Sequence, residues 1–323
     1  MIIVKIFQGP GNQLFQYAYA FAAAKRLNVE LKLDLSWYRA YSKHRQYILD
    51  RFQITAQEAT EQEIYDIKSC NGANFIEYRW NLLNRKHLQP YYRKPVVVEN
   101  LDKFDQNYKK VIDNTYIEGY FASRDFFEDQ LPAVLQQLQF KSLPNAVNQK
   151  TIEGIKSENA VAISFRLGDF LGQPWQNVCT LEYYRRSISY LSERFENLNF
   201  YVFSDDIDWV KEHFAIPHPT FYMDYNHPDY MEDFRLLTNF KFHIIANSTF
   251  SWWGAMLSQV NEKVVLCPQY WLNPDPASYG MDFEGKAVDF SHVLPNEWIK
   301  IPNLLDGDTQ IVHPTKGNQA FKY

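Results

Sequence analysis

Polar side chains that could bind an anion gather in residues 243–257, which read HIIANSTFSWWGAML. An apolar run there gives way to a helical pattern, and four small hydrogen-bonding residues stand at the junction: Asn247, Ser248, Thr249 and Ser251. Hydroxyl groups and backbone N–H groups at a helix N-terminus bind phosphate well. The same residues could instead only cap the helix, with the tryptophan pair that follows as core. This segment alone leaves both interpretations open.

Charged side chains follow a second apolar run, residues 160–165. Arg166 and Asp169 come after it, and Ser164 lies near its end. A guanidinium group at this place can grip a diphosphate with two hydrogen bonds and offset the charge on a departing nucleotide. The alternative is a structural ion pair between Arg166 and Asp169.

Acidic residues follow a third run, residues 199–204. Asp205 and Asp206 carry groups suited to a phosphate, a ribose or a sugar, and Asp206 with Asp208 has the Asp-x-Asp spacing that can hold Mg²⁺ or Mn²⁺ on a nucleotide-sugar. Because a helical pattern continues beyond them, Asp205 or Asp206 as a helix N-cap is the stronger interpretation. The eight histidines show no metal-ligand spacing. We therefore expect neither a metal site nor a cofactor.

A glycine-rich turn, residues 9–13 (GPGNQ), follows the first apolar run. It lacks the Gly-Lys-Ser/Thr ending of a P-loop and the three glycines of the dinucleotide fingerprint. A tight connection between a strand and a helix is its simplest interpretation. Asn12 could cap that helix, or present its amide to a phosphate or an acceptor hydroxyl.

These loops join strands that alternate with helical patterns. Residues 1–35 form a strand, a helix and a strand, and further strands are expected at 115–121, 160–165, 199–204, 220–223, 242–246 and 263–268. Such alternation predicts parallel, doubly wound sheets that bind ligands beyond the carboxyl ends of their strands. We expect two α/β domains with a cleft between them and a C-terminal tail, with bounds at 1–145, 150–300 and 301–323.

The composition is that of a globular protein, with 46% hydrophobic and 22% charged residues in a chain of 323. A formal net charge of -5 argues against a nucleic-acid partner. Three cysteines are too few for a disulfide framework, and no apolar run approaches the ~20 residues that span a bilayer. We expect a soluble cytoplasmic protein, and peripheral association with the inner membrane stays open.

Five segments together resemble one family, the bacterial α-1,2-fucosyltransferases of glycosyltransferase family eleven. They are, in chain order, GPGNQLFQYAYAFAAAKRLN, YIEGYFASRDFF, ISFRLGDF, VFSDDIDWVK and MEDFRLLTNFKFHIIANSTFSWWGAML. The resemblance extends from residue 1 to about residue 271. The last segment is long and unusual enough to be very specific.

The resemblance implies a GT-B enzyme with two Rossmann-like domains that moves L-fucose from GDP-β-L-fucose to a galactose 2-hydroxyl, with inversion and without metal. Arg166 then matches the arginine that holds the β-phosphate, and residues 247–251 match the phosphate-facing turn. Ser164 and His243 match positions that face guanine in related enzymes. The C-terminal domain would bind the donor. The N-terminal domain would bind the acceptor, a galactose-terminated oligosaccharide or a lipid-linked glycan.

The chain departs from the family pattern His-x-Arg-Arg-Gly-Asp-Tyr, because residues 164–170 read SFRLGDF. The leading histidine and the second arginine are missing, so Arg166 should bear most of the leaving-group charge. Inversion also needs a group that accepts the acceptor's proton. Asp169 is our candidate for this base, and the alternatives are Asp34, Glu118 and Asp125.

Two other functions stay open at this stage. One is a transferase that uses another GDP-sugar or forms another linkage. The other is a non-catalytic sugar-binding protein that exploits the aromatic residues, which make up 17% of the chain. A binding protein has no need of Arg166 and would release no GDP from a nucleotide-sugar.

Overall fold

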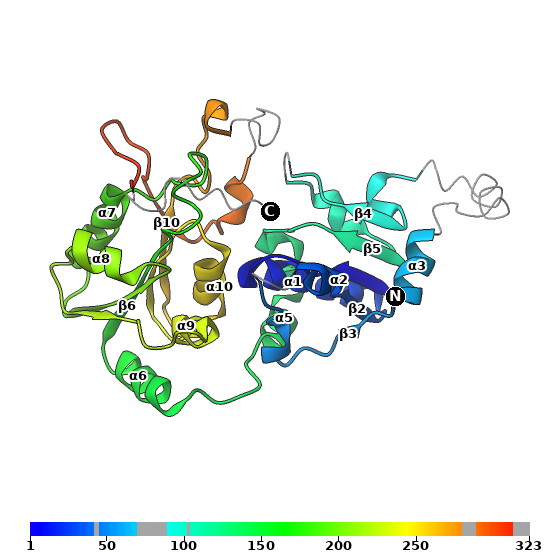
Figure 1. The fold of residues 1–323 in the computed structure, drawn as a ribbon, viewed down its shortest axis with the longest axis horizontal. Coiled ribbons are helices and arrows are strands. Elements are labelled where there is room, and N and C mark those ends of the chain that lie inside the picture. Colours follow the sequence, from blue (N-terminus) through cyan, green and yellow to red (C-terminus); the bar gives the residue numbers. More distant parts are fainter. Residues whose placement is uncertain (42–44, 70–88, 102–103, 280–288, 313–323) are drawn as a thin grey trace. The chain divides into compact units, whose positions relative to one another are not determined.

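The computed structural model describes residues 1–41, 45–69, 89–101, 104–279 and 289–312. These residues form two compact units that divide between Lys141 and Ser142 (Figure 1), a few residues before the expected boundary. Each unit contains a parallel β-sheet with helices between its strands. The predicted α/β fold with two parallel sheets is therefore confirmed.

The N-terminal unit contains a five-stranded sheet with the order β3-β2-β1-β5-β4, and all neighbouring strands are parallel. The strands are β1 (Ile2–Lys5), β2 (Leu31–Asp34), β3 (Gln57–Glu58), β4 (Val96–Val98) and β5 (Thr115–Glu118). The apolar residues of β1 are all buried, as expected for a central parallel strand with both faces covered. The strand order reverses between β1 and β5, so the carboxyl ends of these two strands form the switch point of this sheet.

Helix α1 (Pro10–Leu27) follows β1 and packs against it. A proline at its first position and a left-handed Asn28 (φ 53°) at its end set its limits. Besides β3 and β4, the described residues between β2 and β5 form short helices and 3₁₀ turns. These elements and the ones that follow them are α2 (Ser36–Tyr41), η1 (Leu49–Arg51), α3 (Glu61–Ser69), η3 (Tyr91–Arg93), η4 (Gln106–Lys110), η5 (Arg124–Phe126), η6 (Glu128–Gln130) and α5 (Leu131–Gln137).

The C-terminal unit contains a six-stranded parallel sheet with the order β11-β10-β9-β6-β7-β8. The strands are β6 (Asn159–Phe165), β7 (Leu198–Ser204), β8 (Thr220–Tyr222), β9 (Phe242–Ile244), β10 (Val264–Pro268) and β11 (Ile299–Ile301). Five of them match predicted strands, whereas β11 was not predicted. The order reverses between β6 and β9, so the loops after these two strands share the switch point.

Helices cover both faces of this sheet. Val161, Ile163 and Phe165 of β6 pack with residues of α7 and α8, while Ala160 and Ala162 pack with residues of α6 and α9. Because neighbouring side chains of a strand point to opposite faces, both faces of β6 are buried. The helices and turns of the unit are α6 (Ala146–Lys156), α7 (Leu181–Ser192), α8 (Ile207–His213), α9 (Tyr230–Leu237), α10 (Thr249–Leu257), η7 (Pro276–Tyr279) and η9 (Ser291–Val293).

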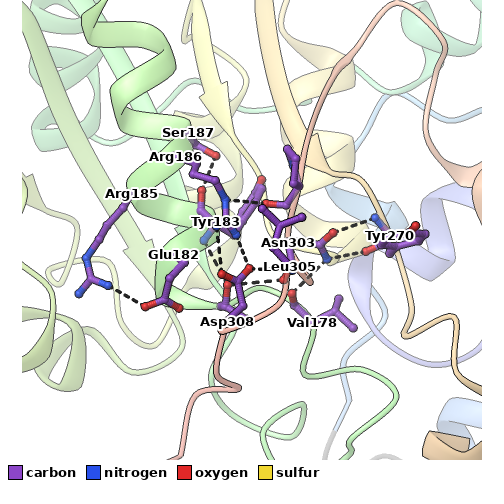
Figure 2. A network of polar contacts seen from close by, with 12 residues as sticks. Val178, Glu182, Tyr183, Arg185, Arg186, Ser187, Tyr270, Asn303, Leu305 and Asp308 are labelled. Carbon is purple, nitrogen blue, oxygen red and sulfur yellow. Dashed lines mark hydrogen bonds and ion pairs between the residues drawn. The ribbon is translucent and has the colours of Figure 1, made fainter.

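Residues 301–312 belong to the C-terminal unit, which corrects the expectation of a tail that starts at residue 301. Figure 2 shows the polar network that holds them. Asn303 is fully buried, and its amide donates to the backbone oxygens of Val178 and Tyr270 at 3.0 and 2.9 Å. Arg186 of α7 forms an ion pair with Asp308 and donates to Pro302 O. Residues 313–323 lie outside the described part of the chain.

None of the helices that the structure describes is both long and apolar enough to cross a membrane.

Candidate active site

Arg166 comes directly after β6, at the switch point of the C-terminal sheet. Its Nη2 donates to Asp169 Oδ1 at 2.5 Å, and its Nη1 lies 2.9 Å from Asp205 Oδ2. The guanidinium carbon lies 5.2 Å from the centre of the Phe170 ring. The side chain remains 28% exposed. The predicted ion pair with Asp169 therefore exists, and it orients a guanidinium group that a ligand can still reach.

Asp205, which was expected to bind the donor, fixes the backbone of the Arg166 loop. Its Oδ1 accepts the N–H of Leu167 at 2.8 Å, and its Oδ2 accepts the N–H of Gly168 at 2.8 Å. A Cβ atom on Gly168 would lie only 2.5 Å from Asp205 Oδ2, so a larger residue here would displace the Asp205 carboxylate. Leu167, at the position of the missing second arginine, is fully buried in the core. The Asp205 carboxylate thus positions Arg166 in two ways. It pairs with the guanidinium group, and it holds the backbone of the two residues that follow Arg166.

The turn after β9 uses several of its polar groups to hold the fold together. Asn247 is 3% exposed, and its amide donates to the backbone oxygens of Gln176 and Trp271 at 2.8 and 3.0 Å. Its Oδ1 accepts the thiol of Cys179 at 3.4 Å. The hydroxyl of Ser251 donates to Ser248 O within the turn. For Asn247 and Ser251 these contacts support the structural interpretation, and donor binding by these side chains stays a prediction.

Ser248 and Thr249 are the two polar residues of this turn that remain half-exposed. Ser248 is the N-cap residue of α10, although its side chain makes no capping hydrogen bond, and Thr249 is the first residue of the helix. Trp252 and Trp253 are fully buried, and Trp252 Nε1 donates to Val293 O at 2.8 Å. The two tryptophans are therefore core residues, which is one of the interpretations that the sequence allowed. The groups of this turn that a ligand can reach are Ser248, Thr249 and the N-terminus of α10.

His243 and Ser164 do not have the surroundings expected of guanine contacts. His243 is 1% exposed in the middle of β9, where its Nε2 lies 3.1 Å from Phe240 O. Burial, with a contribution from Lys263, lowers its pKa to about 3, so the imidazole is neutral. Ser164 is also buried, and its backbone oxygen accepts the hydroxyl of Tyr184 at 3.1 Å. The ring of His243 belongs to the interior of the sheet, and its expected contact with guanine stays a prediction.

Asp206 caps helix α8, as the stronger interpretation predicted. Its Oδ1 accepts the N–H of Trp209 at 3.2 Å. The side chain of Asp208 is 90% exposed and lies 3.6 Å from Lys211. Within the described ranges, no group of three or more histidine, cysteine or acidic side chains could hold a metal ion. The Asp-x-Asp spacing thus belongs to a capped helix start, and the expected contact of Asp206 with the donor stays a prediction.

Asn12 lies in the first turn of α1, in the N-terminal unit, so it belongs to a different unit from Arg166. Its neighbour Gln13 is fully buried and fixes this turn: its amide donates to Gln8 O and Gln46 O and accepts the N–H of Ile48. Asn12 itself is half-exposed. Its proposed contact with a phosphate or an acceptor hydroxyl stays a prediction.

Glu99 is a residue that the sequence reasoning missed. It follows β4, and its Oε2 accepts the N–H groups of Tyr120 and Phe121 at 2.6 and 2.8 Å. Burial raises its pKa to about 7, even though these two N–H donors lower it. The sequence feature that could have indicated Glu99 is the apolar run VVV, residues 96–98, which an acidic residue follows. The residues around this run show no regular pattern of strands or helices, so it was not predicted as a strand.

The sequence pattern of glycosyl transferase family 11 matches residues 79–281. The chain belongs to this family. It is 28% identical to an α-1,2-colitosyltransferase of Escherichia coli over 314 residues, which cover 93% of this chain and 99% of the relative. It is 29% identical to the O-antigen biosynthesis glycosyltransferase WbnK of Escherichia coli over 282 residues, which cover 81% and 92%.

The similar solved structures include two fucosyltransferases. NodZ from Bradyrhizobium has 12% identity and a TM-score of 0.45, with 79% of this chain and 92% of that one covered. FUT1 from Arabidopsis thaliana, in complex with GDP, has 14% identity and a TM-score of 0.46, with 85% and 72% covered. These are distant likenesses, and the assignment to a family of glycosyltransferases rests on the sequence match.

Proposed function

We propose that this glycosyltransferase moves L-fucose from GDP-β-L-fucose to the 2-hydroxyl of a galactose in an oligosaccharide, with inversion. The observation that carries the proposal is Arg166, a half-exposed guanidinium group fixed at the switch point of a parallel sheet. This is where such sheets bind nucleotides. The C-terminal unit would bind the donor and the N-terminal unit the acceptor.

In this proposal Arg166 binds the diphosphate and stabilises the charge that grows on the β-phosphate as the bond to the sugar breaks. Its two carboxylate partners, Asp169 and Asp205, leave the cluster with a formal charge of -1. A second source of positive potential is therefore needed. Helix α10 begins after β9, the strand next to β6, and its N-terminal N–H groups with the hydroxyls of Ser248 and Thr249 can supply it. No step requires a metal ion.

A second candidate is the transfer of colitose from its GDP derivative. It is favoured by one observation, the name of the relative that aligns with 93% of this chain. In that case the linkage could be the same while the donor differs. The name of the second relative refers to O-antigen biosynthesis, which supports an oligosaccharide or lipid-linked glycan as acceptor. A lipid-linked acceptor would bring the protein to the cytoplasmic face of the inner membrane.

The test is GDP release from GDP-fucose and from GDP-colitose, measured against a panel of galactose-terminated oligosaccharides. NMR of the product gives the linkage. We expect release with GDP-fucose, formation of an α-1,2 linkage and full activity in excess EDTA. A preference for GDP-colitose would favour the second candidate, and activity lost in EDTA but restored by Mn²⁺ would contradict the metal-free mechanism. Glycan binding without GDP release would indicate a sugar-binding protein.

A further inference from the structure

The switch point of the N-terminal sheet lies between the carboxyl ends of β1 and β5, which are neighbours in the sheet. Parallel sheets bind ligands in the crevice beyond such a point. The residues that follow the two strands are aromatic: the rings of Phe7 and Tyr120 lie 5.1 Å apart, and both side chains are half-exposed. This edge therefore presents an accessible apolar wall of the kind that a sugar ring can stack against.

A carboxyl group is fixed beside this wall. Glu99 follows β4, and its Oε2 accepts two backbone N–H groups from the segment after β5, those of Tyr120 and Phe121. A Cβ atom on Gly119 would lie 2.4 Å from Glu99 Cβ, so only glycine leaves room for this approach. Tyr108 holds the backbone on both sides of Glu99, because its hydroxyl accepts Asn100 N–H and donates to Val98 O. The orientation of the Glu99 carboxyl group is thus set by the fold.

The surroundings of Glu99 favour a proton acceptor that works near neutral pH. Aromatic residues lie around it, and burial raises its pKa to about 7. The titratable groups that face it are Tyr19 of α1 and Tyr108 of η4. Burial, with a contribution from Glu99 itself, raises the pKa of both phenols, so they stay neutral. A base whose pKa lies near the working pH is the most effective one.

Other carboxyl groups at this edge are already engaged. Asp34 accepts the hydroxyl of Tyr116 at 2.7 Å and the N–H of Ser36 at 2.9 Å. Glu118 forms an ion pair with Lys5 at 2.6 Å. For Glu99 the structure records hydrogen bonds to Oε2 alone within the described ranges, which leaves Oε1 for a ligand.

We propose that Glu99 is the general base of the transfer reaction and that Oε1 takes the proton of the acceptor hydroxyl. The acceptor oxygen then forms the bond to the anomeric carbon of the donor sugar. The bond from that carbon to the phosphate oxygen breaks, and its electron pair leaves with the nucleoside diphosphate. The inference rests on the proposed function in that it requires a sugar acceptor. In place of acting as base, Asp169 then orients Arg166.

The test compares Glu99→Gln with Glu58→Gln, which removes a carboxylate at the end of β3, from the same edge of the sheet. Glutamine is isosteric and its oxygen can still accept the two N–H groups. For Glu99→Gln we expect kcat to fall by ~10²–10⁴-fold, while the melting temperature and the affinity for GDP stay at the wild-type values. For Glu58→Gln we expect a change in kcat within ~3-fold, as for loss of its surface ion pair with Arg39.

The pH profile separates a catalytic role from a structural one. The base must be deprotonated to act, so the wild-type kcat should rise with pH through about 7 and then level off, and Glu99→Gln should lack this rise. A wild-type kcat that stays flat between about pH 6 and 8 overturns the inference without any variant. A Glu99→Gln enzyme with normal kcat and a lowered melting temperature also overturns it. A wild-type protein that transfers no sugar overturns the proposed function instead.

Discussion

Two turns at the same edge of the C-terminal sheet use their polar residues in opposite ways. The turn after β6 keeps Arg166 half-exposed and holds it with the carboxylates of Asp169 and Asp205. In the turn after β9, Asn247 is buried and its amide donates hydrogen bonds to two backbone oxygens. β6 and β9 are neighbours, so both turns lie at the switch point. Position at this edge of the sheet is therefore not enough to leave a side chain accessible to a ligand.

The difference follows from what each turn must support. Asn247 joins the loop before α7 to the loop after β10, and these loops carry backbone groups that would otherwise be buried without partners. The backbone N–H groups of the turn after β6 are accepted by Asp205, while the side chain of Arg166 stays 28% exposed. Its guanidinium group is thus available for a ligand. The following predictions test this contrast, in order of decreasing effect.

Removal of Arg166 should have the largest effect, and the effect should be catalytic. We expect Arg166→Ala to lower kcat by ~10²–10³-fold, which is about 3–4 kcal/mol of transition-state stabilisation, as for loss of one preorganised donor. Arg166→Lys keeps the charge but lacks the forked geometry, so it should recover only part of the rate. Melting curves and kcat of both variants are the measurement. A fully active Arg166→Ala enzyme would contradict the mechanism.

Truncation of Asn247 should instead act on stability. Asn247→Ala leaves the backbone oxygens of Gln176 and Trp271 without their donor in a buried site, which should cost about 2–4 kcal/mol of unfolding free energy. Chemical denaturation measures this cost, and kcat per folded molecule should change little. Ser248→Ala, at a half-exposed position of the same turn, is the matched control and should leave stability within about 0.5 kcal/mol. If Asn247→Ala folded normally and lost GDP binding, the contrast between the two turns would fail.

Asp205→Asn should lower both catalytic activity and stability. The amide has the same size but cannot accept at both oxygens, and it loses the charge that orients Arg166. We expect kcat/KM to fall roughly 10-fold, together with a lower melting temperature, because a misplaced group loses much of its catalytic effect. Asp208→Asn, whose side chain is 90% exposed, should leave both quantities unchanged. Equal losses in the two variants would show that general charge, rather than position, is responsible.

Thr249→Val should have the smallest effect. It removes one half-exposed hydroxyl at the N-terminus of α10 and keeps the shape of the side chain. The loss of one hydrogen bond to the diphosphate should weaken GDP binding by about 1 kcal/mol, or roughly 5-fold, without unfolding the protein. Calorimetric titration with GDP measures it. An unchanged affinity for GDP would indicate that the whole turn has a structural role only.

The sequence predicted the fold well because the strands of buried parallel sheets are apolar along their whole length. Residues 160–165 and 199–204 have this pattern and form β6 and β7. It also placed Arg166 and residues 247–251 at loops that the structure brings to one edge. It failed for β11, whose three residues read IKI and which, among the strands that the structure describes, pairs with β10 alone. Such a short edge strand exists because its neighbour provides the pairing partner, which local sequence does not record.

What the sequence determined by itself is the set of elements, their parallel arrangement and the identity of the residues at the strand ends, since side-chain periodicity and helix capping are local properties. Only the tertiary structure decided which of these residues can meet a ligand. His243 and Asn247 are buried by elements distant in the chain, whereas Arg166 and Glu99 are fixed by Asp205 and by the backbone after β5. Burial and hydrogen-bond partners come from the packing of remote segments, and they assign a polar side chain either to the fold or to the chemistry.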